Sequence, residues 1–195
     1  YGLDADGTER TYTFEELRDR TNQLANYLRA QGIERGDRVG VNAPQKPETV
    51  IAHIAIWKLG AVSVPLSTLF GTEAVRYRLE DANAKACIVD RSNVETLRAV
   101  RDELATLSEV VVIDDDDSHP ETGFWDAIEG SSRELDTVDT HAEDDAIIIY
   151  TSGTTGDPKG VRHAHRVLLG NLPMFVTSVC NMEMSPDDVF WTPSE

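Results

Sequence analysis

The chain has 195 residues, of which 40% are hydrophobic, so it is long enough to bury a core and too apolar to be a disordered segment. It carries 35 Asp and Glu residues against 18 Lys and Arg residues, a formal net charge of −17. A surface this acidic repels phosphate backbones and anionic lipids, so we expect neither nucleic-acid binding nor peripheral membrane binding.

The basic residues are mostly arginine. Lysine occurs only at Lys46, Lys58, Lys85 and Lys159, which leaves 14 arginines among the 18 basic residues. Many carboxylates with few lysines are typical of proteins from a salt-rich cytoplasm, where molar salt shortens the Debye length to about 3 Å and screens self-repulsion. The composition therefore predicts a halophilic protein.

Cysteine usage and apolar runs favour a cytoplasmic protein. Cys87 and Cys180 are too few and too far apart for a disulfide framework or a metal cluster, so we expect free thiols, Cys87 within an apolar strand. No signal peptide is visible, and the longest apolar run, 50–57, is too short to span a bilayer. The chain begins without Met and ends without a helix stop, so we expect a fragment of a longer protein.

The N-terminal part predicts a small hairpin followed by helices and strands. Asp6-Gly7 is a turn signal, and residues 13–16, Thr-Phe-Glu-Glu, form a capping box for a helix that ends at Gly32. In chain order we then expect a strand at 38–41, a buried helix at 48–59 opened by Pro47, a strand at 61–65, a helix at 72–83 capped by Thr72, a strand at 86–90, a helix at 93–104, a strand at 109–113, an acidic loop at 114–121 and a short helix at 124–128.

This alternation of strand and helix predicts an α/β fold with a mainly parallel sheet covered on both faces. We expect a first βα subdomain at 1–130 and an acidic linker at 131–145. Residues 146–195 should then hold a buried strand (Ala-Ile-Ile-Ile-Tyr at 146–150), a glycine-rich loop and a following helix.

The loop at 151–160 reads Thr-Ser-Gly-Thr-Thr-Gly-Asp-Pro-Lys-Gly. Its glycines let the backbone approach a ligand, its hydroxyls and amides offer donors to phosphate oxygens, and Lys159 adds a positive charge. The loop leaves the end of a parallel-type strand, where open α/β sheets bind ligands. The spacing of Gly153, Gly156 and Lys159 does not match a Walker A loop. The alternative is a plain turn that joins a strand to a helix.

The segment 150–161, Tyr-Thr-Ser-Gly-Thr-Thr-Gly-Asp-Pro-Lys-Gly-Val, closely resembles the signature of the adenylate-forming (AMP-binding) superfamily. Residues 11–17 and 58–66 resemble its first two core motifs, in the right order, and residues 53–70 and 188–193 look most like short- and medium-chain acyl-CoA synthetases. The resemblance implies flavodoxin-like βα units in the N-terminal part of an acetyl-CoA synthetase-like domain.

The resemblance implies an acid–thiol ligase that uses ATP, Mg²⁺ and CoA, as in fatty acid metabolism. A carboxylate would attack the α-phosphorus of ATP to give an acyl-adenylate, and the CoA thiol would then displace AMP. By resemblance, the residues that hold the β- and γ-phosphates are Thr151, Ser152, Gly153, Thr154, Thr155, Gly156 and Lys159. Lys159 would also be catalytic through its charge, Pro158 would stiffen the turn, and Asp157 should face solvent or act through the metal.

Alternatives remain within and beyond this family. An aryl-CoA ligase or an adenylation domain that loads a carrier protein would share the first half-reaction, and a non-catalytic nucleotide-binding module would share only the loop. The family's adenine, ribose, metal and C-terminal lysine sites lie further along the chain, so we predict that the fragment is inactive alone.

The remaining polar and aromatic residues give weaker signals. His165 and Trp191 are, by resemblance, candidate neighbours of an acyl pocket, whereas the pair of His163 and His165 lacks a third metal ligand. We expect the four aspartates at 114–117 to form a solvated loop rather than a metal site, and His53 to be a hydrogen-bonded core residue. Trp57 and Trp125 should be core aromatics.

Overall fold

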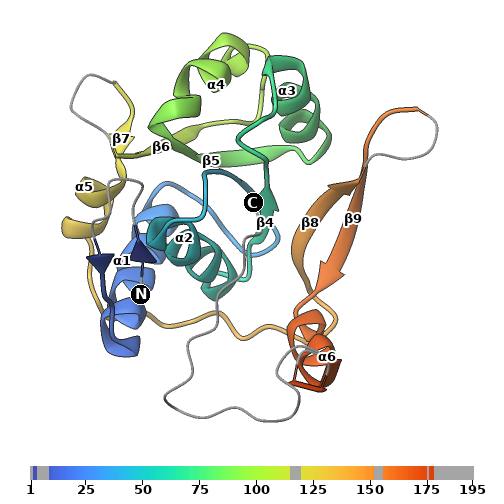
Figure 1. Ribbon diagram of the computed structural model, residues 1–195. Coiled ribbons are helices and arrows are strands. Elements are labelled where there is room, and N and C mark those ends of the chain that lie inside the picture. Colours follow the sequence, from blue (N-terminus) through green and yellow to red (C-terminus); the bar gives the residue numbers. More distant parts are fainter. Residues whose placement is uncertain (1, 4–8, 115–119, 152–155, 175, 178–195) are drawn as a thin grey trace.

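Apolar strand segments alternate with helices along the chain, and they form a seven-stranded sheet with helices on both faces (Figure 1). The computed structural model describes residues 2–3, 9–114, 120–151, 156–174 and 176–177. The strands are β1 (Gly2–Leu3), β2 (Glu9–Arg10), β3 (Arg38–Asn42), β4 (Val62–Pro65), β5 (Ala84–Asp90), β6 (Glu109–Ile113), β7 (Thr122–Gly123), β8 (Asp145–Thr151) and β9 (Lys159–Ala164). The helices are α1 (Phe14–Ala30), α2 (Pro47–Lys58), α3 (Thr72–Asp81), α4 (Val94–Arg101), α5 (Phe124–Glu129) and α6 (Arg166–Met174), with a 3₁₀ turn at Arg91–Asn93.

The strand order confirms the predicted parallel α/β sheet. The large sheet runs β7-β6-β5-β3-β4-β8-β9, and every neighbouring pair is parallel except the antiparallel pair β8–β9. Counted from β3, the five strands β4-β3-β5-β6-β7 have the flavodoxin order 2-1-3-4-5. The separate pair β1–β2 is the predicted N-terminal hairpin, and its turn residues lie outside the described part of the chain.

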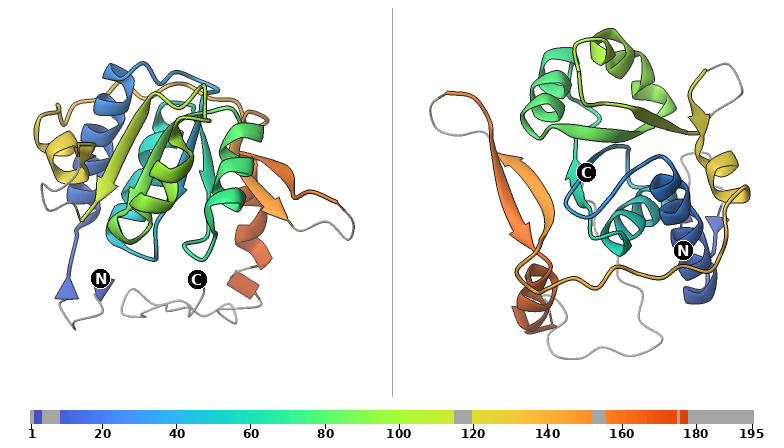
Figure 2. Two further views of the ribbon diagram at one scale, coloured as in Figure 1. Left: turned by 90° about the horizontal axis from the view of Figure 1, so that it is seen from above. Right: turned by 180° about the vertical axis from the view of Figure 1, so that it is seen from behind.

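Two apolar cores lie on opposite faces of the sheet because successive strand residues point to opposite sides. Val39 and Val41 of β3 join α1, α2 and α5 in one core, whereas Cys87 and Val89 of β5 join α3 and α4 in the other. Figure 2 shows the two groups of helices on either side of the sheet. Cys87 is a buried free thiol, as predicted, and its burial raises its pKa to about 12. Cys180 lies outside the described residues.

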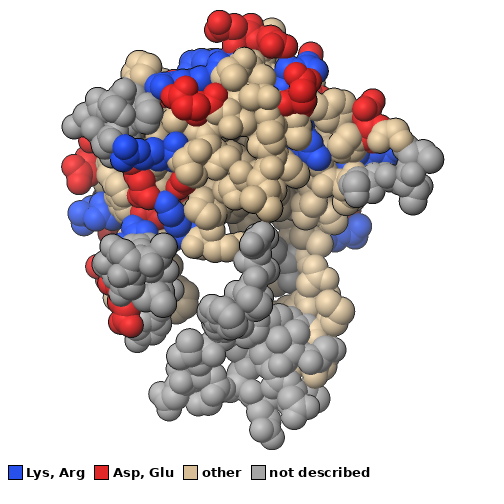
Figure 3. Space-filling model, turned by 45° about the horizontal axis from the view of Figure 1, so that its top comes forward, with Lys and Arg blue, Asp and Glu red and all other residues tan. Residues whose placement is uncertain are grey.

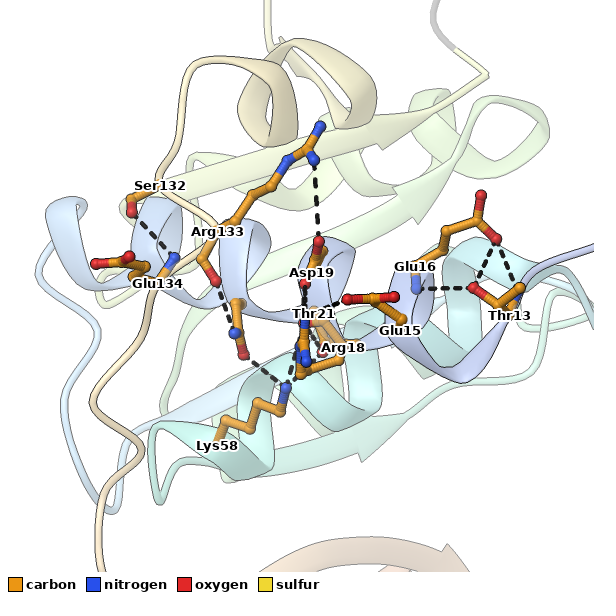
Figure 4. Close-up of polar contacts among 11 residues, drawn as sticks. Thr13, Glu15, Glu16, Arg18, Asp19, Thr21, Lys58, Ser132, Arg133 and Glu134 are labelled. Carbon is orange, nitrogen blue, oxygen red and sulfur yellow. Dashed lines mark hydrogen bonds and ion pairs between the residues drawn. The ribbon is translucent and has the colours of Figure 1, made fainter.

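Residues 132–136 of the connecting segment 131–144 lie along α1, and most of these residues remain exposed. Asn22 and Asn26 donate hydrogen bonds to their backbone carbonyls at 2.7–2.9 Å, including those of Arg133 and Glu134. In Figure 4, Lys58 reaches from α2 to Thr21 of α1, with 2.7 Å between Nζ and Oγ1. These contacts tie α1, α2 and the segment together.

Helix ends follow the local signals, with one exception. Thr13 and Glu16 form the predicted capping box, and Gly32 adopts a φ of +83° just after α1. The predicted cap at Thr72 is wrong: Gly71 is the N-cap residue of α3, without a side-chain hydrogen bond, and Thr72 is the first helical residue. Phe14, the first residue of α1, is 94% exposed.

The elements β8, β9 and α6 differ most from the predictions made from the sequence. The strand predicted as buried, β8, has only Ala146 fully buried, and Ile149 is 40% exposed. The glycine-rich loop leads not into a helix but into β9, an antiparallel partner of β8, and α6 follows after that strand. Ile148 and Tyr150 of β8 pack against the second core, and β9 forms the edge of the sheet.

Charged side chains of both signs share the surface. Figure 3 shows Asp and Glu side chains beside Lys and Arg side chains over the face in view. On α3, Arg76 pairs with Glu73 and Glu80, and on α4 Arg98 pairs with Glu95 and with Glu121. Within the described residues, no helix is long and apolar enough to cross a membrane.

Candidate functional site

The glycine-rich loop is carried by the β8–β9 hairpin. Thr151, the last residue of β8, is the register partner of Lys159, the first residue of β9. Both are exposed. Because β8 runs parallel to β4, the loop leaves the sheet at the carboxyl edge of the parallel strands, as predicted. Ser152, Gly153, Thr154 and Thr155 lie outside the described residues.

The backbone conformation at position 156 requires a glycine. Its φ is +91°, in the left-handed region that side chains with a Cβ rarely adopt, and a Cβ there would meet nothing within 4 Å. Asp157, next along the chain, is exposed, as predicted. The sequence Gly-Asp-Pro therefore turns the chain into β9 and leaves its carboxylate on the surface.

Lys159 differs from the other three lysines of the chain. Lys46 pairs with Asp90 and Asp114, Lys85 pairs with Asp37, and the Lys58 ammonium contacts Thr21 and Asn22. Lys159 is exposed and forms no ion pair with any residue that the structure describes. A flexible ammonium of this kind is available to an anionic ligand.

The two histidines after the loop lie in different settings. His163 sits in β9 opposite Ile147, and His165 lies between β9 and α6. The Nε2 atom of His165 is buried and has no hydrogen-bond partner among the described residues. Trp191, the other candidate neighbour of an acyl pocket, lies outside the described part.

The described part of the chain contains no cluster of three or more His, Cys, Asp or Glu side chains that could bind a metal ion. Asp114 pairs with Lys46, and residues 115–117 of the aspartate run are not described.

The expectation that His53 is hydrogen-bonded is wrong. Its Nδ1 is buried and has no hydrogen-bond partner within the described residues, and its ring stacks on that of Trp57 with 5.8 Å between the ring centres. Burial lowers the pKa of His53 to about 4. Trp57 and Trp125 pack against the core, as predicted.

Sequence reasoning missed a group of residues on α3 that contacts the hairpin. The Tyr77 hydroxyl donates to the carbonyl oxygen of Pro158 at 3.0 Å, and the Tyr150 hydroxyl donates to Oδ2 of Asp81 at 2.6 Å. These partners are 81 and 69 positions apart in the sequence, and no pattern in the sequence links them.

Comparison with known proteins gives a consistent result. A protein-family model described as AMP-binding enzyme matches residues 3–195. The 3-hydroxybenzoate–CoA/4-hydroxybenzoate–CoA ligase of Thauera aromatica is 35% identical over 162 residues, which cover 83% of this chain and 31% of the relative. The acetyl-coenzyme A synthetase of Bacillus subtilis is 32% identical over 197 residues, which cover 98% of this chain and 33% of the relative.

Solved structures agree with these relatives. The anthranilate CoA ligase AuaEII, in complex with anthranoyl-AMP, matches with a TM-score of 0.83 and 31% identity, over 87% of this chain and 33% of that one. An acyl-CoA synthetase from Brucella canis matches with a TM-score of 0.84 and 29% identity, over 98% of this chain and 34% of that one. The chain thus spans about a third of the length of these relatives. By its family match, its fold and its glycine-rich hairpin, the chain belongs to the AMP-binding enzyme family.

Proposed function

We propose that the protein containing this chain activates a carboxylic acid with ATP, through an acyl-adenylate, and then transfers the acyl group to CoA. The observation that carries this proposal is the pairing of Thr151 with Lys159 at the mouth of the glycine-rich loop, at the carboxyl edge of the sheet. The family match supports it, since the relatives named above are CoA ligases and synthetases.

The chain's own residues would hold the phosphates. The Thr151 hydroxyl and the backbone amide of Gly156 would donate to phosphate oxygens, and the Lys159 ammonium would offset the charge that develops on the departing pyrophosphate. By resemblance, Ser152, Gly153, Thr154 and Thr155 complete this set. Lys159 is suited to the task because no described carboxylate neutralises it, so its charge remains available to the ligand.

The acid is proposed to be short or medium in chain length, as in fatty acid metabolism, on the resemblance of residues 53–70. An aryl acid is the main alternative, because one relative is a hydroxybenzoate–CoA ligase and one solved structure holds anthranoyl-AMP. A carrier-protein thiol as acceptor, or a non-catalytic nucleotide-binding module, are further alternatives. His165, whose buried Nε2 has no hydrogen-bond partner in the described part of the chain, is proposed to lie near the acyl pocket, together with Trp191.

The chain is proposed to need the rest of the protein for catalysis. It supplies phosphate-binding residues, and we assign no ligand of the Mg²⁺ ion that accompanies ATP to the described residues. We propose the division into a βα subdomain (1–130), a connecting segment (131–145) and the loop-bearing part (146–195). Adenylate formed by the isolated 195-residue chain would overturn the proposed dependence.

The decisive experiment is carboxylate-dependent exchange of pyrophosphate into ATP, measured on the full-length protein in molar KCl. Acetate, butyrate, octanoate and benzoate are supplied in turn. We expect exchange with one or more of the acids and a loss of about 100-fold in Lys159→Ala, the scale seen when one charge-stabilising donor is removed. Lys85→Ala is the matched control, because Lys85 pairs with Asp37, and it should stay within about twofold. A folded protein that binds ATP but exchanges nothing would favour the non-catalytic module.

A further inference from the structure

We propose that helix α3 positions the phosphate-binding residues, with Tyr77 and Asp81 acting as positioning residues for Thr151 and Lys159. This inference rests on the proposed function of the loop. Tyr77 and Asp81 belong to none of the sequence motifs, and they contact the hairpin at the end that carries the glycine-rich loop.

The hairpin has little support from the sheet where the loop begins. β8 pairs with β4 through one register pair, Ser63 with Ile147. Thr151 lies four residues further on, roughly 13 Å at the usual rise of a strand. On its other side β8 pairs only with β9, which is the edge strand of the sheet (Figure 1). The pair Thr151–Lys159 therefore needs another support.

That support comes from two tyrosine hydroxyls. Tyr77 of α3 donates to the carbonyl oxygen of Pro158, the residue before Lys159, and Tyr150, the residue before Thr151, donates to Asp81 of α3. One contact thus holds each strand, directly beside the phosphate-binding residue of that strand. Because Thr151 and Lys159 are already register partners, fixing both strands to one helix sets the position of this pair relative to the sheet.

A buried arginine strengthens the contact. The Arg78 guanidinium lies 4.1 Å from the centre of the Phe70 ring and 5.7 Å from that of Tyr150. Arg78 is 8% exposed and forms no ion pair with a described residue; its guanidinium donates a hydrogen bond to the Ala74 carbonyl oxygen at 2.7 Å and faces the two aromatic rings. Tyr77 meets the Tyr150 ring edge to face at 6.4 Å. The Tyr150 ring is therefore held from two sides.

Gly160 makes room for this arrangement. It is the register partner of Tyr150, and a Cβ on Gly160 would lie 3.1 Å from Cζ of Tyr150 and 2.9 Å from Cγ2 of Ile148. The Tyr150 ring thus lies across the glycine backbone. A side chain at position 160 would displace the Tyr150 ring, which gives a physical reason for a glycine directly after Lys159.

The test compares two tyrosine hydroxyls in the full-length protein. Tyr77→Phe removes only the hydroxyl that reaches Pro158. Tyr27→Phe is the matched control, since its hydroxyl also joins two elements, donating to Glu109 at 2.7 Å, but between α1 and β6. Pyrophosphate exchange gives kcat and the KM values for ATP and for the acid, and calorimetry gives the Kd for ATP. We expect Tyr77→Phe to raise the KM and Kd for ATP about five- to tenfold, the factor that loss of one hydrogen bond gives, with the KM for the acid unchanged.

The control outcomes separate positioning from a structural role. Tyr27→Phe should leave both KM values and the Kd within about twofold of the parent. Asp81→Asn keeps an acceptor for Tyr150 and should retain near-parental ATP binding, whereas Asp81→Leu should behave as Tyr77→Phe does. The inference is overturned if Tyr77→Phe leaves the Kd for ATP unchanged, or if it lowers kcat alone. Absence of exchange in the parent would remove the proposed function, while the Kd comparison would still decide whether α3 positions the loop.

Discussion

The Lys46 ammonium lies 2.7 Å from Oδ2 of Asp90, at the carboxyl ends of the neighbouring strands β3 and β5. The Asp90 side chain is only 6% exposed, and burial by itself would raise its pKa. The hydrogen bonds that Asp90 accepts from Lys46 and Ser92 outweigh burial and lower the pKa below its ordinary value. A buried carboxylate thus depends on one partly exposed lysine.

Lys46→Met should therefore destabilise the protein by about 3 kcal/mol, the scale seen when one partner of a buried pair is removed. A lowered folded pKa means that the pair stabilises the protein above the unfolded value near 3.9, and that this contribution is lost as pH falls through the folded pKa. The variant should lack this loss on acidification. Denaturant unfolding from pH 7 to pH 3 measures both effects. Arg166→Met, which breaks the exposed pair with Glu143, should cost under about 1 kcal/mol, and equal costs for the two variants would contradict the argument.

Gly40 of β3 lies beneath Leu79 of α3. A Cβ on Gly40 would stand 2.6 Å from Cδ2 of Leu79 and 3.1 Å from Sγ of Cys87, both in the second core. Gly40→Ala should destabilise the protein by about 1–3 kcal/mol, because the buried leucine has to shift. Gly130→Ala is the control, with its nearest contact at 3.6 Å, and should change stability by less than about 0.5 kcal/mol. Equal thermal midpoints for Gly40→Ala and the parent would show that the core yields without cost.

The buried His53 side chain should make the free energy of unfolding depend on pH. Burial lowers its folded pKa to about 4, against an unfolded value near 6.5. Between these values the unfolded chain binds a proton that the folded chain does not, so stability falls as pH falls, by up to about 1.4 kcal/mol per pH unit. His53→Phe keeps an aromatic ring beside Trp57 and should flatten the dependence between pH 6.5 and pH 4. A parental slope in His53→Phe would rule out His53 as its source.

The net charge of −17 predicts stabilisation by salt. Like charges on the surface repel one another, and the Debye length falls from about 10 Å at 0.1 M salt to about 3 Å at 1 M. The thermal midpoint of the protein should therefore rise steadily with KCl up to molar concentrations. A midpoint that stays flat across this range would contradict the proposed adaptation to salt.

Much of the fold could be predicted because its signals are local. The capping box at Thr13, Pro47 at the start of α2 and the apolar run of β6 each act within a few residues, so the elements occur close to where the sequence placed them. The alternation of these elements likewise predicted the parallel sheet. The glycine-rich segment indicated a phosphate-binding loop for the same reason, since its backbone freedom, hydroxyls and lysine lie within ten consecutive residues.

The tertiary structure alone decided how that loop is held. Whether the residues after the loop continue as a helix or as β9 depends on hydrogen bonds to β8, and the apolar pattern of the sequence does not distinguish the two. The pairing of Tyr77 with Pro158 and of Asp81 with Tyr150 arises only because the strand order brings α3 beside the hairpin. The hydroxyl, glycine and lysine residues of the loop are thus consecutive in the sequence and could be recognised there. The partners that hold the hairpin are distant in sequence and become adjacent only after folding.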